Sequence, residues 1–292
     1  IKSGIITMTR LDVTVASLAS EAKPLAPSFG LEFTNKQLAT LVSEQFDELY
    51  STLVRHKLLI FRKQDTSPQQ LMQIAERLGE VQRYPFSSGI EGFPEIVEIR
   101  KEPDQKNVFS GVWHIDSTYL ESPPDFTLLA AKQTPEVGGD TVFADSQKAF
   151  AALSEGMQKF LLSEKAEFIS NKIQEAGNKA PHLVNFTDIA MANTFFSASH
   201  SAAKRHEESG IPGIYVNAEH TSRFTSMSAE ESAPILDYLF SHITRDEFTA
   251  RVRWENDTIV LWDNRGLQHH AVNDYYGQLR VMHRIIVRSA MR

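Results

Sequence analysis

The segment Trp113–Asp116 places an imidazole and a carboxylate two residues apart. In a β-strand, side chains at positions i and i+2 project from the same face, so His114 and Asp116 would converge on one side of the chain. A second histidine would complete the two-histidine, one-carboxylate set that holds non-haem Fe(II) with open coordination positions. A His-x-Asp pattern occurs by chance in many proteins, so this interpretation also requires a third ligand and an anion site.

The C-terminal end of the chain offers both missing parts. The segment Trp262–Ala271 contains adjacent histidines, His269 and His270, after a hydrophobic run and a turn. Arg280 and Arg284 follow in a β-type run, where the alternation of side chains places them on one face. Arginines are costly to bury unless they meet anions. The two arginines therefore indicate an anion site. Without other evidence, the same pattern also fits a strand face that is exposed to solvent.

Composition excludes several other kinds of site. The chain has 292 residues and no cysteine, which excludes disulfide scaffolds, iron–sulfur clusters, thiolate zinc sites and cysteine nucleophiles. Its formal net charge of −7 argues against broad nucleic-acid binding, which needs a cationic surface. Two histidines and one carboxylate also serve catalytic zinc, so a zinc hydrolase stays an alternative.

The sequence shows no sign of a membrane or secretory segment. No apolar run approaches the roughly 18 residues needed to cross a bilayer. The N-terminal IKSGIITMTR lacks the apolar core of a secretory signal. We therefore expect a cytoplasmic protein with no nucleic-acid or membrane partner. Met8 is interpreted as the natural start, which predicts one domain over residues 8–292 and leaves a homo-oligomeric state open.

Three stretches combine a capping signal with helical periodicity. Ser67 followed by Pro68 offers a capping hydroxyl and a proline at the first helical position. A hydroxyl residue followed three positions later by Glu or Gln, the capping-box pattern, occurs at Thr34 and at Ser228. The predicted helices cover residues 34–55, 67–79 and 228–242.

Short β-type runs lie between and after these helices. They cover residues 58–61, 95–99, 126–130, 141–143, 213–216, 248–254, 258–262 and 280–287. Many short strands, with few helices in the second half, predict a mainly β fold: a jelly-roll core with flanking helices. Residues 165–205 are polar and weakly periodic, which predicts a lid-like insertion.

Taken together, the motifs resemble the taurine/2,4-dichlorophenoxyacetate dioxygenase family of Fe(II)- and 2-oxoglutarate-dependent oxygenases. The match runs from about Leu58 to Arg288. Its motifs are, in order, Trp-His-x-Asp at 113–116, Ser-Pro-Pro at 122–124, Gly-Gly-Asp-Thr at 138–141, Tyr-Val-Asn at 215–217, Trp-Asp-Asn-Arg at 262–265, Gln-His at 268–269 and Arg-Val-Met-His-Arg at 280–284. Several motifs in the family's order are far more specific than any one of them. The resemblance implies a double-stranded β-helix (jelly-roll, cupin-like) core.

The resemblance also implies which residues form the site. His114, Asp116 and His269 would ligate iron, and His269 is favoured over His270 because it follows the glutamine of the family motif. Neutral imidazoles and one carboxylate suit Fe(II) and leave positions free for a keto acid and dioxygen. The retained carboxylate at position 116 favours hydroxylation or another oxidation over halogenation.

Three further residues are implied to bind the organic ligands. Thr141 and Arg280 would hold the distal carboxylate of the co-substrate 2-oxoglutarate, and Arg284 would bind the acidic group of the substrate. With Fe(II) and O2, the expected reaction oxidises a small anionic substrate (a sulfonate, sulfate ester or carboxylate) and releases succinate and CO2.

The expected substrate pocket departs from that of taurine dioxygenase itself. Where that enzyme has His-x-His-Pro, this chain reads Gln82–Pro85, and Ser110 and His220 replace an asparagine and an aromatic residue. Tyr84, Ser110 and His220 are therefore expected to line a pocket for a larger or more aromatic acid than taurine. Two alternatives stay open: desaturation or cyclisation of an amino-acid-like substrate with the same cofactors, and a jelly-roll module that binds an organic acid without turnover.

Overall fold

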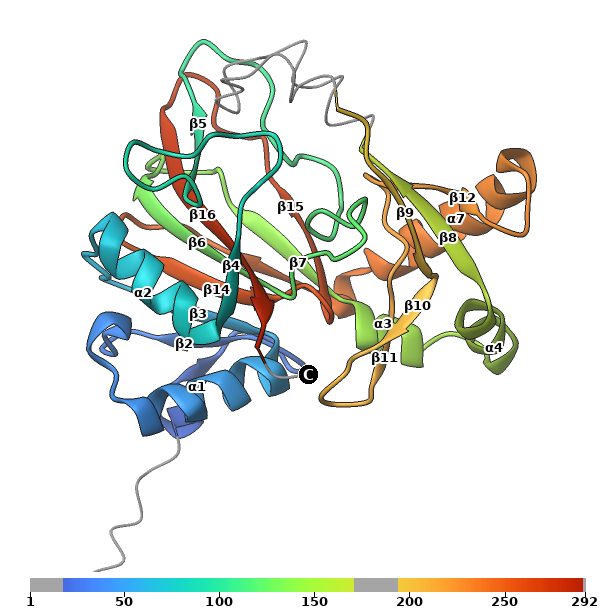
Figure 1. Ribbon diagram of the computed structural model, residues 1–292, viewed down its shortest axis with the longest axis horizontal. Coiled ribbons are helices and arrows are strands. Elements are labelled where there is room, and N and C mark those ends of the chain that lie inside the picture. Colours follow the sequence, from blue (N-terminus) through green and yellow to red (C-terminus); the bar gives the residue numbers. More distant parts are fainter. Residues whose placement is uncertain (1–17, 171–193, 291–292) are drawn as a thin grey trace, which may run out of the picture.

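The structure is a computed structural model that describes residues 18–170 and 194–290 (Figure 1). Its main sheet has eight strands in the order β1-β2-β3-β14-β6-β16-β4, with β5 paired to β16. The strands are β1 (Lys23–Pro24), β2 (Leu31–Phe33), β3 (Leu58–Phe61), β4 (Gly79–Gln82), β5 (Val97–Lys101), β6 (Phe126–Gln133), β14 (Ile259–Asp263) and β16 (Arg280–Ser289). Neighbouring strands are antiparallel except for β2 and β3, which are parallel.

A second, three-stranded antiparallel sheet has the order β13-β7-β15. Its strands are β13 (Thr249–Val252), β7 (Thr141–Asp145) and β15 (Leu267–Ala271). Phe143 and Leu267 of this sheet pack in one apolar cluster with Trp262 and Met282 of the main sheet. A mostly antiparallel sheet and an antiparallel sheet that share a core form a jelly-roll arrangement. The predicted mainly β fold class with flanking helices is confirmed.

Two helices cover the outer face of the main sheet, α1 (Ser43–His56) and α2 (Pro68–Leu78) (Figure 1). Along β3, Leu59 and Phe61 pack in the cluster that contains the helix residues, whereas Leu58 and Ile60 pack in the cluster between the sheets. Side chains of a strand alternate between its two faces. Both faces of the main sheet are therefore buried, which explains the continuous apolar run at this strand.

A third layer lies at the other end of the molecule in Figure 1. It is a three-stranded sheet, β12-β8-β9, accompanied by a two-stranded sheet and by helices. Its elements are α3 (Ser146–Ala151), α4 (Glu155–Ser163), β8 (Lys165–Ile169), β9 (Ser197–Ser201), β10 (Ala203–Arg205), β11 (Pro212–Ile214), β12 (Thr221–Phe224) and α7 (Ala229–Ile243). Phe168, Phe224 and Leu239 are fully buried in its apolar cluster. Short 3-10 turns cover Leu18–Glu21, Leu38–Thr40 and Asp246–Phe248.

Two of the three predicted helix starts are confirmed. The Ser67 hydroxyl accepts a hydrogen bond from the Gln70 N–H at 3.2 Å, and α2 ends at Gly79 as expected. The Ser228 hydroxyl accepts from the Glu231 N–H at 3.2 Å, which begins α7. In both cases the Glu or Gln side chain bonds back to the capping residue, which completes the capping box.

The helix start predicted at Thr34 is wrong, because α1 begins at Ser43. The Gln37 side chain does not cap a helix but donates to the Lys63 carbonyl at 2.9 Å. Phe33 lies in β2, where its ring stacks on Phe61 with centroids 4.7 Å apart. The chain is thus still held in the β2–β3 pair at Phe33, immediately before the predicted start.

The predicted insertion over residues 165–205 is ordered at both of its ends. Strand β8 begins it and β9 pairs antiparallel with β8, so the segment leaves and returns along one sheet. Residues 171–193, in the middle of the predicted lid, lie outside the described residues. Within residues 18–170 and 194–290, no helix is long and apolar enough to span a membrane.

Candidate active site

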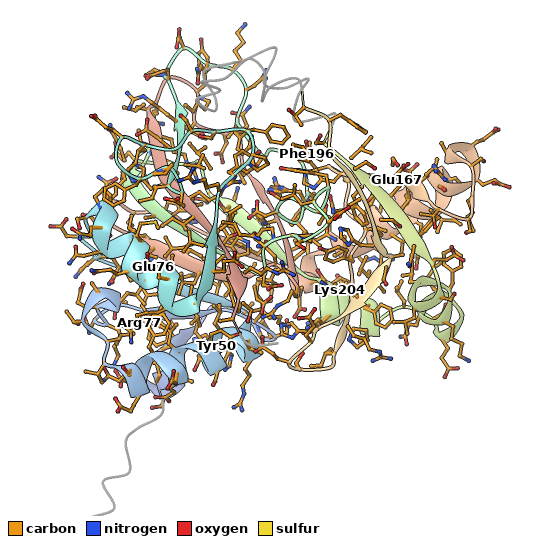
Figure 2. The ribbon with its side chains drawn as sticks, in the orientation of Figure 1. Tyr50, Glu76, Arg77, Glu167, Phe196 and Lys204 are labelled. Carbon is orange, nitrogen blue, oxygen red and sulfur yellow. The ribbon has the colours of Figure 1, made fainter. Side chains whose placement is uncertain are left out.

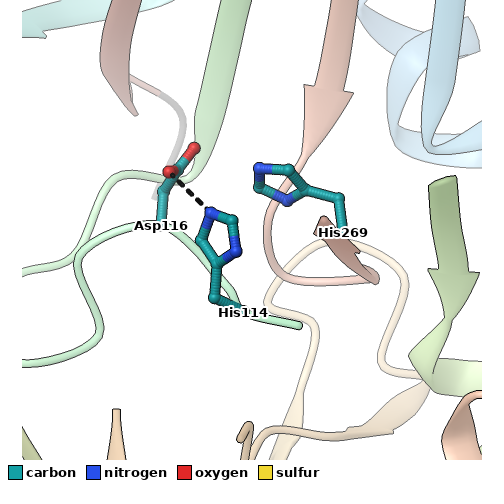
Figure 3. A group of neighbouring side chains, drawn as sticks. All are labelled: His114, Asp116 and His269. Carbon is teal, nitrogen blue, oxygen red and sulfur yellow. Dashed lines mark ion pairs between the residues drawn. The ribbon is translucent and has the colours of Figure 1, made fainter. Parts of the chain in front are cut away.

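Two backbone hydrogen bonds bring the first and last of the predicted metal ligands together. The His114 N–H donates to the His269 carbonyl at 3.0 Å, and the His269 N–H donates to the His114 carbonyl at 2.9 Å. Residues that exchange both bonds lie directly opposite each other and point to the same side. The two imidazole rings therefore face one another, with centroids 4.2 Å apart (Figure 3).

Asp116 completes the cluster, with its Oδ1 lying 3.8 Å from His114 Nε2 (Figure 3). One ligand atom from each of His114, Asp116 and His269 lies within 4.8 Å of the other two. The three side chains are buried, with residue exposures of 4%, 2% and 6%. Residues far apart in the sequence are thus gathered at a single interior point, as the sequence predicted.

The rings of the two histidines are held by different contacts. His114 Nδ1 lies 2.8 Å from the Val112 carbonyl, an acceptor, so the ring proton resides on Nδ1 and the Nε2 lone pair faces the cluster. His269 packs between Phe143 and Trp262, with centroid distances of 5.5 and 4.7 Å. Burial and the neighbouring His114 hold the pKa of His269 well below its ordinary value, which favours the neutral form that ligates metals.

A chain of hydrogen bonds fixes the Asp116 carboxylate from behind. The Thr127 hydroxyl donates to Asp116 Oδ2 at 2.6 Å, Asn264 Nδ2 donates to Thr127 Oγ1 at 2.9 Å, and Trp262 Nε1 donates to Asn264 Oδ1 at 2.9 Å. Neither Thr127 nor Asn264 was predicted as a site residue. The signal for Asn264 was present, because it belongs to the Trp-Asp-Asn-Arg motif.

Arg284 lies against the same carboxylate, with its Nη1 3.3 Å from Asp116 Oδ1. Burial alone would raise the pKa of Asp116. The positive charge of Arg284, the two imidazoles and the Thr127 hydrogen bond together lower it to about 2. Asp116 is therefore ionised at neutral pH, in the form that can ligate a cation.

The donor set fits Fe(II). Two neutral imidazoles and one ionised carboxylate are the ligands of non-haem Fe(II) oxygenases. His114 Nε2, which faces Asp116, is buried without a hydrogen-bond partner in residues 18–170 and 194–290. Buried polar atoms without partners are rare, and a metal ion supplies such a partner.

Arg284 also contacts a cluster of aromatic side chains. Its guanidinium carbon lies 4.3 Å from the centroid of the Tyr84 ring and 5.8 Å from that of Phe109. The ring of Phe86 contacts Tyr84, Tyr119 and Phe196 at centroid distances of 5.6, 5.8 and 5.5 Å. We call Tyr84, Phe86, Tyr119 and Phe196 the aromatic wall; Figure 2 labels Phe196.

The two residues predicted to bind 2-oxoglutarate meet at a third residue. Trp254 Nε1 donates to Thr141 Oγ1 at 3.0 Å, and the Arg280 guanidinium carbon lies 5.8 Å from the centroid of the Trp254 ring. Because its oxygen accepts from Trp254, the Thr141 hydroxyl can donate its own proton to a ligand. Trp254 was predicted only as part of a strand. Its contacts with Thr141 and Arg280 depend on the tertiary structure.

Arg280 and Arg284 share a face of β16, as the sequence predicted. The alternative prediction, that this face of the strand is exposed to solvent, is wrong, because the two residues are only 4% and 5% exposed. Helices α1 and α2 cover the opposite face of the sheet, where Ile285 and Val287 pack. Arginines buried in this way require anionic partners.

His220 lies beside the metal cluster, with its ring 6.1 Å from His114 and 5.0 Å from Tyr119 between centroids. Asn217 Nδ2 donates to the Thr118 hydroxyl at 3.2 Å, and that hydroxyl lies 2.8 Å from His220 Nδ1. Since Thr118 Oγ1 already accepts from Asn217, its own proton is placed to bond Nδ1. This arrangement favours the tautomer with the proton on Nε2.

The structure places two other predicted residues at the edge of the site. Ser110 is half-buried, and its carbonyl accepts from the Ala271 N–H at 2.9 Å, next to the ligand strand β15. His270 packs its ring on Trp113 at a centroid distance of 4.4 Å and is outside the metal cluster. The choice of His269 as the ligand therefore agrees with the geometry.

Known proteins of similar sequence cover most of the chain. It is 28% identical over 270 residues to an alkylsulfatase of Acinetobacter baylyi, which covers 91% of this chain and 84% of that protein. It is 28% identical over 275 residues to an alpha-ketoglutarate-dependent sulfate ester dioxygenase of Pseudomonas putida. That alignment covers 92% of this chain and 89% of the Pseudomonas protein.

A solved structure shares the fold, and a family model matches the chain almost throughout. A taurine dioxygenase from Burkholderia xenovorans superposes with a TM-score of 0.77 at 24% identity, over 92% of this chain and 90% of that one. The model described as taurine catabolism dioxygenase TauD, TfdA family, matches residues 21–286. The predicted enzyme class, an Fe(II)- and 2-oxoglutarate-dependent dioxygenase, and its cofactors are confirmed. The chain belongs to the TauD/TfdA family of dioxygenases.

Proposed function

We propose that this dioxygenase oxidises a small organic anion whose acidic group binds Arg284 and whose apolar part lies against the aromatic wall. One observation supports this most directly. Arg284 is buried beside the metal cluster, and its Nε and Nη2 have no hydrogen-bond partner in the described part of the chain. Asp116 contacts only Nη1, so the rest of the planar fork is available to a sulfonate, sulfate or carboxylate.

The metal would be held by His114, Asp116 and His269. When bound, Fe(II) supplies the activation of O2 that converts 2-oxoglutarate into succinate and CO2 and oxidises the substrate. The protein orients the ligands: Val112 and Thr127 fix one histidine and the carboxylate through hydrogen bonds of 2.8 and 2.6 Å. Such contacts tune metal affinity as well as ligand geometry.

Arg280 and Thr141 would bind the distal carboxylate of 2-oxoglutarate. Arg280 is buried and its Nε has no hydrogen-bond partner in the described residues. The guanidinium can form charge-assisted hydrogen bonds, and the Thr141 hydroxyl adds a neutral donor. Separation of Arg280 and Arg284 by four residues along β16, about 13 Å, gives each ligand its own arginine.

The aromatic wall supports a substrate with an apolar chain or ring. Phe86 meets Phe196 edge to face and Tyr119 at a tilt, and these three rings offer apolar surface without any further charge. The likeness to a sulfate ester dioxygenase and an alkylsulfatase supports alkyl sulfate esters as the first compounds to test. Tyr84 and His220 would contact the substrate next to Arg284.

The predicted single domain over residues 8–292 stays a prediction. The same holds for a homo-oligomeric state, a cytoplasmic location and the absence of nucleic-acid and membrane partners.

The test is a screen that measures substrate loss and succinate formation together. Enzyme with Fe(II), O2 and 2-oxoglutarate is offered alkyl sulfates, alkyl sulfonates, aryloxy acids, amino acids and the uncharged alcohols of the same carbon skeletons. We expect an anionic compound with an apolar body to be consumed with an equal amount of succinate formed. Equal consumption of the uncharged alcohol, or no coupled turnover with any anion, would contradict the proposal.

A further inference from the structure

Lys101 is a second cation beside the predicted 2-oxoglutarate arginine. It is the last residue of β5, and the register of β5 on β16 places it directly opposite Arg280. Directly opposed residues of antiparallel strands project from the same face, with Cβ atoms about 5 Å apart. Val97 and Ile99 precede Lys101 on this face and pack in the interior aromatic cluster, so Lys101 also points inward.

The two cations are buried and incompletely partnered. Lys101 is 3% exposed, and its Nζ has no hydrogen-bond partner within residues 18–170 and 194–290. Its ammonium lies 4.4 Å from the centroid of the Tyr275 ring. A Cβ added at Gly139 would lie 3.2 Å from both Arg280 Cδ and Tyr275 Cδ1, so the Tyr275 ring that Lys101 contacts also lies near the Arg280 side chain.

Nearby carboxylates do not neutralise this pair. Asp140 acts on Arg280 from a distance but is ion-paired with Arg251 at 3.2 Å. Burial lowers the pKa of Lys101, and Asp104 only partly opposes that effect. A buried ammonium that lacks a hydrogen-bond acceptor is costly, so an anion bound by Lys101 and Arg280 would remove a cost that the ligand-free protein bears.

We propose that Lys101 and Arg280 together bind the distal carboxylate of 2-oxoglutarate, with Tyr275 as the surface on which the ammonium rests. This inference rests on the proposed role of Arg280. The β5–β16 register argues against the primary substrate as the anion, because Arg284 is opposite Val97 at the other end of the ladder. Lys101 is therefore four residues along the strand, about 13 Å, from the substrate arginine.

Replacement of the ammonium by an uncharged side chain of similar length tests the proposal. Binding to Lys101→Met is measured anaerobically with Fe(II), by titration with 2-oxoglutarate and separately with 2-oxobutyrate, which lacks the distal carboxylate. We expect about tenfold weaker binding of 2-oxoglutarate, the loss of one charge-assisted hydrogen bond, and unchanged binding of 2-oxobutyrate. Lys106→Met is the matched control, because Lys106 is exposed on the loop that follows β5.

Thermal unfolding separates this role from a structural one. Without ligand, Lys101→Met should be at least as stable as the wild type, because the substitution removes a buried charge that lacks an acceptor. A purely structural lysine would instead give a lower Tm and an equal loss of affinity for both keto acids, which would overturn the proposal. If Lys101→Met does not fold, Lys101→Gln and Lys101→Arg are compared: only Lys101→Arg should retain the preference for 2-oxoglutarate over 2-oxobutyrate.

Wild-type titrations keep this inference distinguishable from the proposed function. If the wild type binds 2-oxoglutarate with Fe(II) and Lys101→Met binds it equally well, the role of Lys101 is wrong while the enzyme assignment stands. If the wild type does not prefer 2-oxoglutarate over 2-oxobutyrate, the proposed role of Arg280 itself fails.

Discussion

At the scale of single residues, the backbone pairing of His114 with His269 decides which of two adjacent histidines can ligate a metal. The His269 ring faces His114, whereas the next ring along β15 packs on Trp113. Neighbouring residues of a strand point to opposite faces, so the two histidines cannot exchange roles without a shift of register.

A pair of alanine substitutions tests this difference. His269→Ala should abolish Fe(II) binding and coupled succinate formation, because it removes one of the three proposed protein ligands. His270→Ala should keep measurable activity, since its ring contacts Trp113 rather than the cluster. Metal content and coupled turnover are measured on both variants, and the reverse pattern would place the third ligand at position 270.

The two arginines of β16 should separate by ligand. Arg280→Ala should raise the dissociation constant of 2-oxoglutarate roughly ten- to a hundredfold, because a hydrogen bond to a charged group is worth about 1.5–3 kcal/mol. Arg284→Lys should weaken the primary substrate while uncoupled consumption of 2-oxoglutarate continues, because an ammonium lacks the planar fork. Each variant is titrated with both ligands, and impairment of the same ligand in both would refute the division of roles.

At the scale of elements, β6 supports the metal site through one hydroxyl. Thr127 is fully buried on β6, opposite Trp262 of β14 and Ile286 of β16. Its position between the two neighbouring strands lets it link Asn264 to Asp116. The sheet thus holds the carboxylate in place through a side chain that does not itself ligate the metal.

Thr127→Val keeps the shape of the side chain and removes the hydrogen bond to Asp116. We expect Fe(II) affinity to fall about 10- to 100-fold, the usual effect of losing a contact that orients a metal ligand. Ser67→Ala is the control, because it also removes a single hydroxyl hydrogen bond but lies away from the metal cluster. Loss of the α2 cap should lower the unfolding free energy by about 1 kcal/mol and leave Fe(II) affinity unchanged. Metal titration and urea unfolding of both variants provide the comparison, and equal metal affinity in Thr127→Val and the wild type would exclude the orienting role.

At the scale of the whole molecule, an interior ion cluster joins the main sheet to the third layer. Asp263, at the end of β14, contacts Arg265 at 2.7 Å and His206 at 2.9 Å, and Arg265 reaches Glu208 at 2.8 Å. Burial disfavours the charged form of Asp263, but Arg265 and His206 outweigh it, so its pKa is lowered. The cluster lies at the turn that leads into the ligand strand β15.

Asp263→Asn should destabilise the fold at neutral pH by about 3–5 kcal/mol, because Arg265 would stay buried without its main partner. A lowered pKa means that the ionised carboxylate stabilises the folded state above the ordinary pKa of aspartate, and that this stabilisation is lost as the pH falls below it. The difference in unfolding free energy between wild type and variant should therefore shrink below about pH 4. Urea unfolding from pH 7 to 3 measures it, with exposed Asp237→Asn as the control; a pH-independent difference would contradict the ionic explanation.

The sequence by itself determined the mainly β class, two helix starts and the identity of the residues in the metal cluster. These depend on local rules: strand alternation predicted that Arg280 and Arg284 share a face, and capping chemistry predicted the starts at Ser67 and Ser228. The motif order added the family, and with it His269. Strand alternation and capping are each contained within a few adjacent residues, whereas the motif order extends along most of the chain.

Only the tertiary structure decided what those residues contact. The helix expected from Thr34 begins only at Ser43. Phe33, immediately before Thr34, is held by pairing of β2 with β3 and by stacking on Phe61. The pairing of Lys101 with Arg280 depends on the register of strands far apart in the chain. Burial of both faces of β16 depends on helices and strands that no short pattern brings together. It places Arg280 and Arg284 in the interior instead of on a solvated face.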